Sequence, residues 1–147
     1  MKAEFLVDTS VLVTAYDRSK KLKQEMAFEL LNQIAQDGNA ALSTQVLAEF
    51  FTITTRKLPA PLTDVEALNS LENYIRAWRV LEVTGLVVLE AARGARDHLF
   101  NYDQAQIWAT ARLNQIPVVL SEGYNSGSMV EGVRFLDPFA AYFNLRD

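Results

Sequence analysis

Asp8 is the first residue whose setting suggests chemistry. It directly follows a short apolar run, Phe5-Leu6-Val7, and is followed by two hydroxyl residues, Thr9 and Ser10. An acid at the end of a buried strand, with hydroxyls beside it, suits metal or phosphate chemistry. A simpler interpretation is that Asp8 caps the next helix, because Asp is a favoured N-cap residue. The local sequence leaves both interpretations open.

Two more acids stand out by their surroundings. Glu49 lies on an apolar helical segment beside Phe50 and Phe51, and Glu is seldom fully buried unless it is paired. Asp103 stands where a helix is expected to begin, and an acid is favoured there by capping and by the helix dipole. Exposure would explain Glu49, and capping would explain Asp103, without any role in catalysis.

As a set, Asp8, Glu49 and Asp103 suggest a metal site. Hard cations such as Mg²⁺ and Mn²⁺ prefer oxygen ligands. An ion held by these acids would stabilise charge on a phosphodiester and activate water as a nucleophile. Spacing along the sequence does not itself bring the three carboxylates together, so the elements that carry them must do so.

Other kinds of catalytic site find little support. The chain has no cysteine and a single histidine, His98, which we expect to be exposed on a helix near Asp97. No serine elbow stands beside it to complete a triad. The sequence has neither a GxxxxGK[ST] loop nor a GxGxxG loop. A phosphohydrolase with Asp8 as nucleophile would need a second nearby acid, which Asp8-Thr9-Ser10 lacks.

The densest basic run contains Lys20, Lys21 and Lys23. It is either a solvated helix start or a patch that contacts RNA phosphates next to the first acid. Arg93 and Arg96 form a second, weaker candidate patch. The formal net charge of −4 argues against a broad nucleic-acid surface. Bound divalent cations would nevertheless add positive charge where the carboxylates gather.

Short apolar strands alternate with helices along the chain. The sequence predicts strands at 4–8, 40–42, 80–83, 116–120 and 133–136. The first predicted helix is capped by Thr9 or Ser10 and runs to Tyr16. The other predicted helices run over 21–36, from Ser43 or Thr44 to before Pro59, from the capping box at Thr63 to about Arg79, over 84–98, and over 104–114. Residues 121–129 are expected to form a loop, and Pro138 to begin a turn or helix.

This alternation predicts a single α/β domain over residues 1–147, with a mainly parallel sheet covered by helices on both faces. Ligands in such folds bind outside the carboxyl ends of the strands. Asp8 follows the first strand and Glu122 and Gly123 follow the strand at 116–120, so these positions are expected at one edge.

No apolar run approaches the ~20 residues that a membrane span needs. The apolar stretch before Asp8 is also too short for a signal peptide. We therefore expect a cytoplasmic protein without a membrane partner.

Four segments of the chain resemble the PIN-domain ribonucleases, most closely the VapC-like toxins of prokaryotic toxin–antitoxin pairs. These segments are FLVDTSVL (5–12), STQVLAEF (43–50), YDQAQIWATA (102–111) and VVLSEG (118–123). The resemblance implies a three-layer α/β/α fold and an acidic site that binds Mg²⁺ or Mn²⁺. It implies RNA as the substrate, cut by water at a phosphodiester. It also implies a homodimer held inactive by an antitoxin protein.

The resemblance also assigns roles to particular residues. Asp8, Glu49 and Asp103 match the first three acids of the family, which are its catalytic and metal-binding residues. Ser10 matches a hydroxyl that commonly supports the site.

The last segment departs from the family pattern, which usually reads Ser-Glu-Asp or Thr-x-Asp. Ser121 and Glu122 are present as supporting residues, but Gly123 replaces the fourth acid. Glu122 points the other way in an extended chain, unless Gly123 lets the loop turn differently. Two hypotheses follow: a metal-dependent endoribonuclease weakened by this loss, or a PIN-fold module that binds RNA or a partner protein without efficient cleavage.

Overall fold

The computed structural model describes residues 3–145, which contain one six-stranded sheet in the order β3-β2-β1-β4-β6-β5. Neighbouring strands are parallel, except that β5 is antiparallel to β6. The prediction of a mainly parallel sheet is confirmed. The strands are β1 (Phe5–Val7), β2 (Ala40–Ser43), β3 (Arg79–Leu81), β4 (Val118–Leu120), β5 (Met129–Val130) and β6 (Val133–Leu136).

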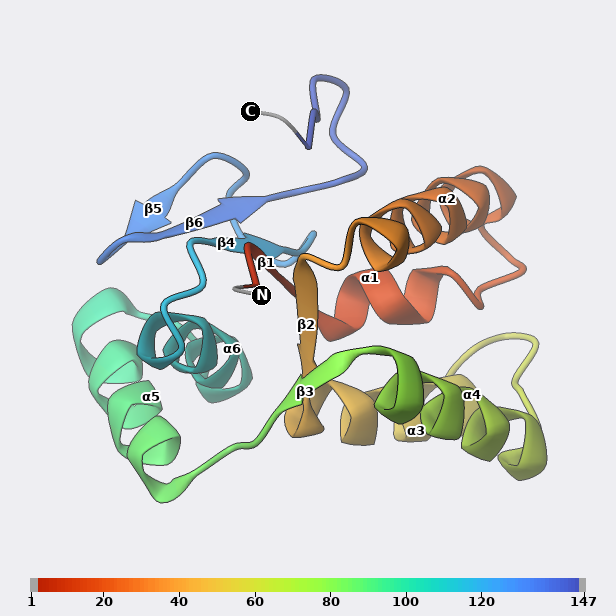
Figure 1. Cartoon of the computed structure of the whole chain (residues 1–147), viewed down its shortest axis with the longest axis horizontal. Helices are drawn as coiled ribbons and strands as arrows, with labels where there is room; N and C mark the ends of the chain where they lie inside the picture. The colour runs from red at the N-terminus through yellow and green to blue at the C-terminus, as the bar shows by residue number, and fades with distance from the viewer. Residues whose placement is uncertain (1–2, 146–147) are drawn as a thin grey trace.

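Helices cover both faces of the sheet, which gives the predicted α/β/α arrangement. In Figure 1, α5 and α6 lie to the left of β2 and β3, and α1 to α4 lie to their right. Within these groups α5 packs against α6, and α1 packs against both α2 and α3. The helices are α1 (Thr9–Thr14), α2 (Lys21–Asp37), α3 (Thr44–Arg56), α4 (Asp64–Ala77), α5 (Gly85–His98) and α6 (Tyr102–Leu113).

The core lies between the layers. All three residues of β1 are buried, as expected for a strand covered on both faces. Trp108 on α6 is fully buried, and a Cβ atom at Gly94 on α5 would lie 2.5 Å from its ring. Gly94 therefore allows the two helices to pack closely, which explains a glycine inside α5. No helix within residues 3–145 is long and apolar enough to span a membrane.

Three details of the predicted elements need correction. The N-cap of α1 is Asp8, so Thr9 and Ser10 lie in its first turn and do not cap it. Helix α4 ends at Ala77, earlier than predicted, which leaves room for β3 to begin at Arg79. Strand β5 occupies the end of the segment expected to be a loop, because Met129–Val130 pairs with β6 across a tight turn. The described residues after Pro138 form turns, one of the two predicted outcomes.

The topology places Asp8 at the point where the strand order reverses. Asp8 follows β1 and Ser121 follows β4, and these two strands are neighbours in the middle of the sheet. The connection from β1 runs outward to β2 and β3, and the chain then returns to β4 on the other side. Such a switch point opens a crevice at the carboxyl ends of the strands, where α/β proteins bind ligands.

Candidate functional site

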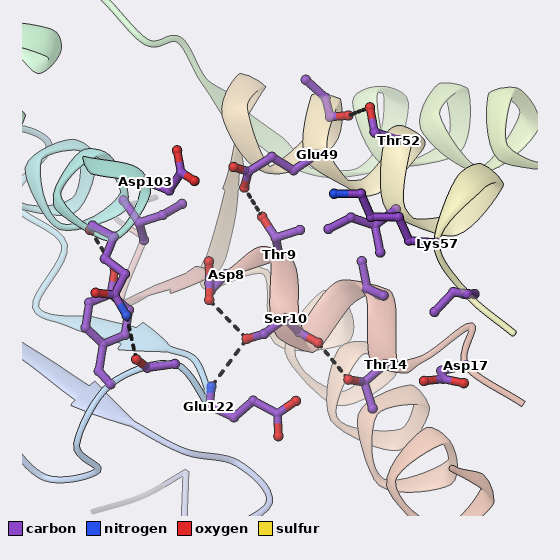
Figure 2. Close-up of a pocket in the computed structure, with 18 of the residues that line it drawn as sticks. Asp8, Thr9, Ser10, Thr14, Asp17, Glu49, Thr52, Lys57, Asp103 and Glu122 are labelled. Carbon is purple, nitrogen blue, oxygen red and sulfur yellow. Dashed lines mark hydrogen bonds between the residues drawn. The ribbon is translucent and has the colours of Figure 1, made fainter. Parts of the chain in front are cut away.

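A pocket of about 710 Å³ opens at this edge of the sheet. Its wall comes from the start of α1, the exposed side of α3, the start of α6 and the loop after β4 (Figure 2). The predicted acids Asp8, Glu49 and Asp103 all line it, together with Asp17 and Glu122. We call this the acidic pocket. The fold thus brings to one place three acids that are up to 95 residues apart in the sequence (103 − 8 = 95).

Asp8 lies at the base of the acidic pocket. Its Oδ2 atom accepts hydrogen bonds from Ser121 Oγ at 2.5 Å and from Ser10 Oγ at 3.0 Å. Burial raises the pKa of Asp8, and these two hydrogen bonds only partly oppose the effect. The side chain makes no capping hydrogen bond to α1, so capping does not account for this acid. Its carboxylate is partly buried without a cationic partner among the described residues.

Glu49 reaches the pocket from the middle of α3. Thr9 Oγ1 donates to its Oε1 atom at 2.6 Å, and Gln45 Nε2 approaches its Oε2 atom at 3.4 Å. The same Gln45 nitrogen donates to the backbone oxygen of Asp103 at 3.1 Å. Gln45 therefore links two of the three acids. Gln45 was not among the residues predicted from the sequence, although it lies one helical turn before Glu49 on the same face.

Asp103 lies in the first turn of α6 and is exposed. The cap of this helix is Asn101, whose side chain accepts from the N–H of Gln104 at 2.9 Å. Two further contacts fasten the start of α6 to the loop after β4: Tyr124 Oη donates to Gln104 O at 2.6 Å, and Gln104 Nε2 donates to Gly123 O at 2.7 Å. Burial raises the pKa of Tyr124, and the nearby charges of Asp8 and Glu49 raise it further.

The loop after β4 turns Glu122 toward α2. Its Oε2 atom lies 2.9 Å from Lys23 Nζ, while its N–H donates to Ser10 Oγ at 3.3 Å. Gly123 contributes no carboxylate. A Cβ atom added to Gly123 would meet Ser121 Oγ at 3.4 Å, an ordinary contact beside the Asp8 site.

The lysines of the basic run differ in their relation to the acidic pocket. Lys20 lines the acidic pocket, Lys23 pairs with Glu122, and Lys21 does not line the pocket. Lys57 also lines it and was missed by the sequence analysis.

The second candidate patch has its charges neutralised by acids. Arg93 pairs with Glu90 and with Glu131, and Arg96 pairs with Asp97. Neither arginine lines the acidic pocket. The expectation that His98 is exposed is wrong, because its ring is partly buried and its Nε2 atom lies 2.6 Å from Glu131.

The donor set of the acidic pocket fits a hard divalent cation. Within residues 3–145, no three His, Cys, Asp or Glu side chains gather closely enough to enclose an ion on their own. Mg²⁺ usually binds through one or two carboxylates and keeps several waters, so a full protein cage is not required. The partly buried Asp8 is the natural anchor, since a cation would offset the cost of burying its charge.

Comparison with known proteins identifies the family. A family model for the PIN domain matches residues 5–125. The chain belongs to the PIN-domain family. The resemblance inferred from the four sequence segments is therefore confirmed. No curated protein sequence matches the chain.

Several solved structures share this PIN fold. The DNA-bound VapBC complex from Salmonella typhimurium has a TM-score of 0.67 at 19% identity, over 92% of this chain and 98% of that one. A toxin–antitoxin complex from Klebsiella pneumoniae has a TM-score of 0.66 at 14% identity, over 91% and 97% of the two chains. VapC20 from Mycobacterium tuberculosis, described as a sarcin–ricin loop cleaving toxin, has a TM-score of 0.62 at 20% identity, over 78% and 86%.

Proposed function

We propose that this PIN domain is a metal-dependent endoribonuclease that hydrolyses RNA phosphodiesters. The observation that carries the proposal is the convergence of Asp8, Glu49 and Asp103 on one pocket at the switch point of the sheet. Membership of the PIN family and a fold shared with a toxin that cleaves the sarcin–ricin loop support it.

The three acids would hold Mg²⁺ or Mn²⁺, which when bound neutralises charge on a phosphodiester and lowers the pKa of coordinated water. The neighbouring hydroxyls have a positioning role. Ser10 and Ser121 fix the orientation of the Asp8 carboxylate, and Thr9 fixes that of Glu49. Hydrogen bonds from Ser10 and Ser121 favour the ionised form of the Asp8 carboxylate, which is the form that binds a cation.

We further propose that the protein is the toxin of a toxin–antitoxin pair and acts in the cytoplasm as a homodimer. The support is that similar structures from Salmonella typhimurium and Klebsiella pneumoniae are toxin–antitoxin assemblies. Purification with the product of a neighbouring small gene, followed by mass measurement of the complex, tests this partnership.

Cleavage of a structured RNA in Mn²⁺ or Mg²⁺ tests the enzymatic proposal. Asp8→Asn removes one anionic ligand at nearly constant shape, and we expect it to lower the cleavage rate by about 100-fold or more. Asp37→Asn is the matched control, because Asp37 is exposed at the end of α2 and does not line the acidic pocket. An unchanged rate in Asp8→Asn would contradict the proposal.

A second candidate function is a binding module that keeps the PIN fold without efficient cleavage. Gly123 in place of the fourth acid is the observation that favours it. Gly123→Asp restores the carboxylate, and the position has room for a side chain. Cleavage that appears only in this variant would make the natural protein a binding module. Cleavage by both proteins would favour the enzyme.

A further inference from the structure

Two lysines share the acidic pocket with its carboxylates. Lys20 and Lys57 line it, and five acids line it as well: Asp8, Asp17, Glu49, Asp103 and Glu122. A polyanion entering this pocket meets an excess of negative charge. A positive side chain on the pocket wall therefore attracts such a ligand and helps to determine where it binds.

Lys57 is the C-cap residue of α3 and continues the face of that helix that carries Glu49. The two residues are eight positions apart, and Ile53 lies midway between them and also lines the pocket. Residues at intervals of four stand above one another on a helix, and eight residues span about 12 Å along its axis. Figure 2 shows Lys57 with its amine turned into the pocket, on the side of Glu49.

The amine of Lys57 has no hydrogen-bond or ion-pair partner in the part of the chain that the structure describes. Among residues 3–145, neither Lys57 nor Lys20 forms a side-chain hydrogen bond or an ion pair. Two other basic residues close to them in the sequence do have partners: Arg56 pairs with Asp64 at 2.8 Å, and Lys23 pairs with Glu122 at 2.9 Å. The lysines that line the pocket are thus available to an incoming anion.

We propose that Lys57, assisted by Lys20, binds a backbone phosphate of single-stranded RNA that flanks the phosphate held at Asp8, Glu49 and Asp103. This inference rests on the proposed function for its substrate class. The backbone of Lys57 lies about 12 Å from that of Glu49 along the axis of α3, which favours contact with a neighbouring phosphate over the reacting one. An ammonium group is a compact point charge suited to a phosphate on a mobile strand.

Salt dependence of RNA binding tests this subsite without requiring cleavage. A fluorescent single-stranded RNA is titrated with the full chain in EDTA, where metal-dependent cleavage is absent and the RNA stays intact. The slope of log Kobs against log[salt] is negative, and loss of one phosphate contact reduces its magnitude by about 0.7 for a single strand. This corresponds to about fivefold weaker binding at 0.1 M salt. We expect this change for Lys57→Gln and recovery in Lys57→Arg.

Arg56→Gln is the matched control. It removes one positive charge from the neighbouring position, but Arg56 is exposed and paired with Asp64 outside the pocket. We expect the control to keep the wild-type slope.

Each result bears on the subsite in a defined way. Equal slopes for Lys57→Gln and Arg56→Gln, or no measurable binding of RNA by the wild type at low salt, would overturn it. A reduced slope confined to Lys57→Gln supports it, even if the wild type cuts no RNA in Mn²⁺. In that case the subsite would stand and the proposed catalysis would fail, so the two conclusions are tested separately.

Discussion

Carboxylates between α5, α6 and the β5–β6 turn are paired with basic side chains, whereas Asp8, Glu49 and Asp103 in the acidic pocket form no ion pair among the described residues. Glu90 pairs with Arg93 and lies 2.7 Å from Arg112. Glu131 lies 3.0 Å from Arg93 and 2.6 Å from His98. We call these five residues the ion network. Its charges join two helices to the end of the sheet.

The pKa shifts of the two regions differ in sign. Hydrogen bonds from Arg93 and then His98 lower the pKa of Glu131 to about 2. Burial raises the pKa of Asp8, and no basic side chain among residues 3–145 pairs with it to oppose the rise. The charge of Glu131 therefore stabilises the folded state, while the charge of Asp8 costs stability. A protein tolerates such a cost where function requires it.

Matched substitutions in the two regions give the largest expected difference. Glu90→Gln removes a largely buried anion and leaves Arg93 and Arg112 without it, so we expect a loss of about 1–3 kcal/mol in the free energy of unfolding. Glu49→Gln removes an anion that has no basic partner within residues 3–145, and its amide oxygen still accepts from Thr9, so the loss should stay below about 1 kcal/mol. Urea unfolding measures both. Equal losses would show that the two regions do not differ.

The second expected effect concerns Asp8 and metal binding. Asp8→Asn keeps an oxygen for Ser10 and Ser121 but removes a buried charge, so we expect equal or higher stability without metal, by up to about 1 kcal/mol. Mn²⁺ at ten times its Kd should stabilise the wild type by about 1.4 kcal/mol and leave the variant unchanged. Thermal unfolding with and without Mn²⁺ measures both. A variant stabilised by Mn²⁺ as strongly as the wild type would place the metal elsewhere.

The third expected effect is acid sensitivity of the ion network. The pKa of Glu131 is about 2 in the folded protein and near 4.5 when unperturbed. The unfolded state therefore binds more protons between these values, and the stabilisation present above pH 4.5 is lost as the pH falls toward 2. Glu131→Gln should flatten this part of the stability curve in urea unfolding from pH 6 to 3. Parallel curves for the wild type and the variant would contradict the role of Arg93 and His98.

The sequence predicted those parts of the candidate site that directly follow the ends of strands. Asp8 was found because an acid directly after a buried strand stands at the edge where parallel sheets bind ligands. Lys57 was missed, although its spacing of eight from Glu49 on one helix was visible. Gln45 and the Lys23–Glu122 pair could not be derived, because they depend on how α3, α6 and α2 pack. The cap of α1 was predicted at Thr9 or Ser10, but the backbone of Asp8 occupies the N-cap position. The Asp8 side chain makes no capping hydrogen bond, so its position in the helix does not reveal its role.

The smallest expected effect comes from the ion pair between Lys23 and the pocket acid Glu122. Lys23 and Glu122 are partly exposed, and surface pairs contribute at most about 1 kcal/mol, so Lys23→Gln should hardly change the free energy of unfolding. It should, however, leave Glu122 free beside Ser10 and strengthen Mn²⁺ binding a few-fold, because the pocket then gains an unneutralised carboxylate. Calorimetric titration with Mn²⁺ measures this, with Lys21→Gln as the matched loss of charge on α2. Equal Mn²⁺ affinity in the two variants would mean that Glu122 cannot replace the acid missing at Gly123.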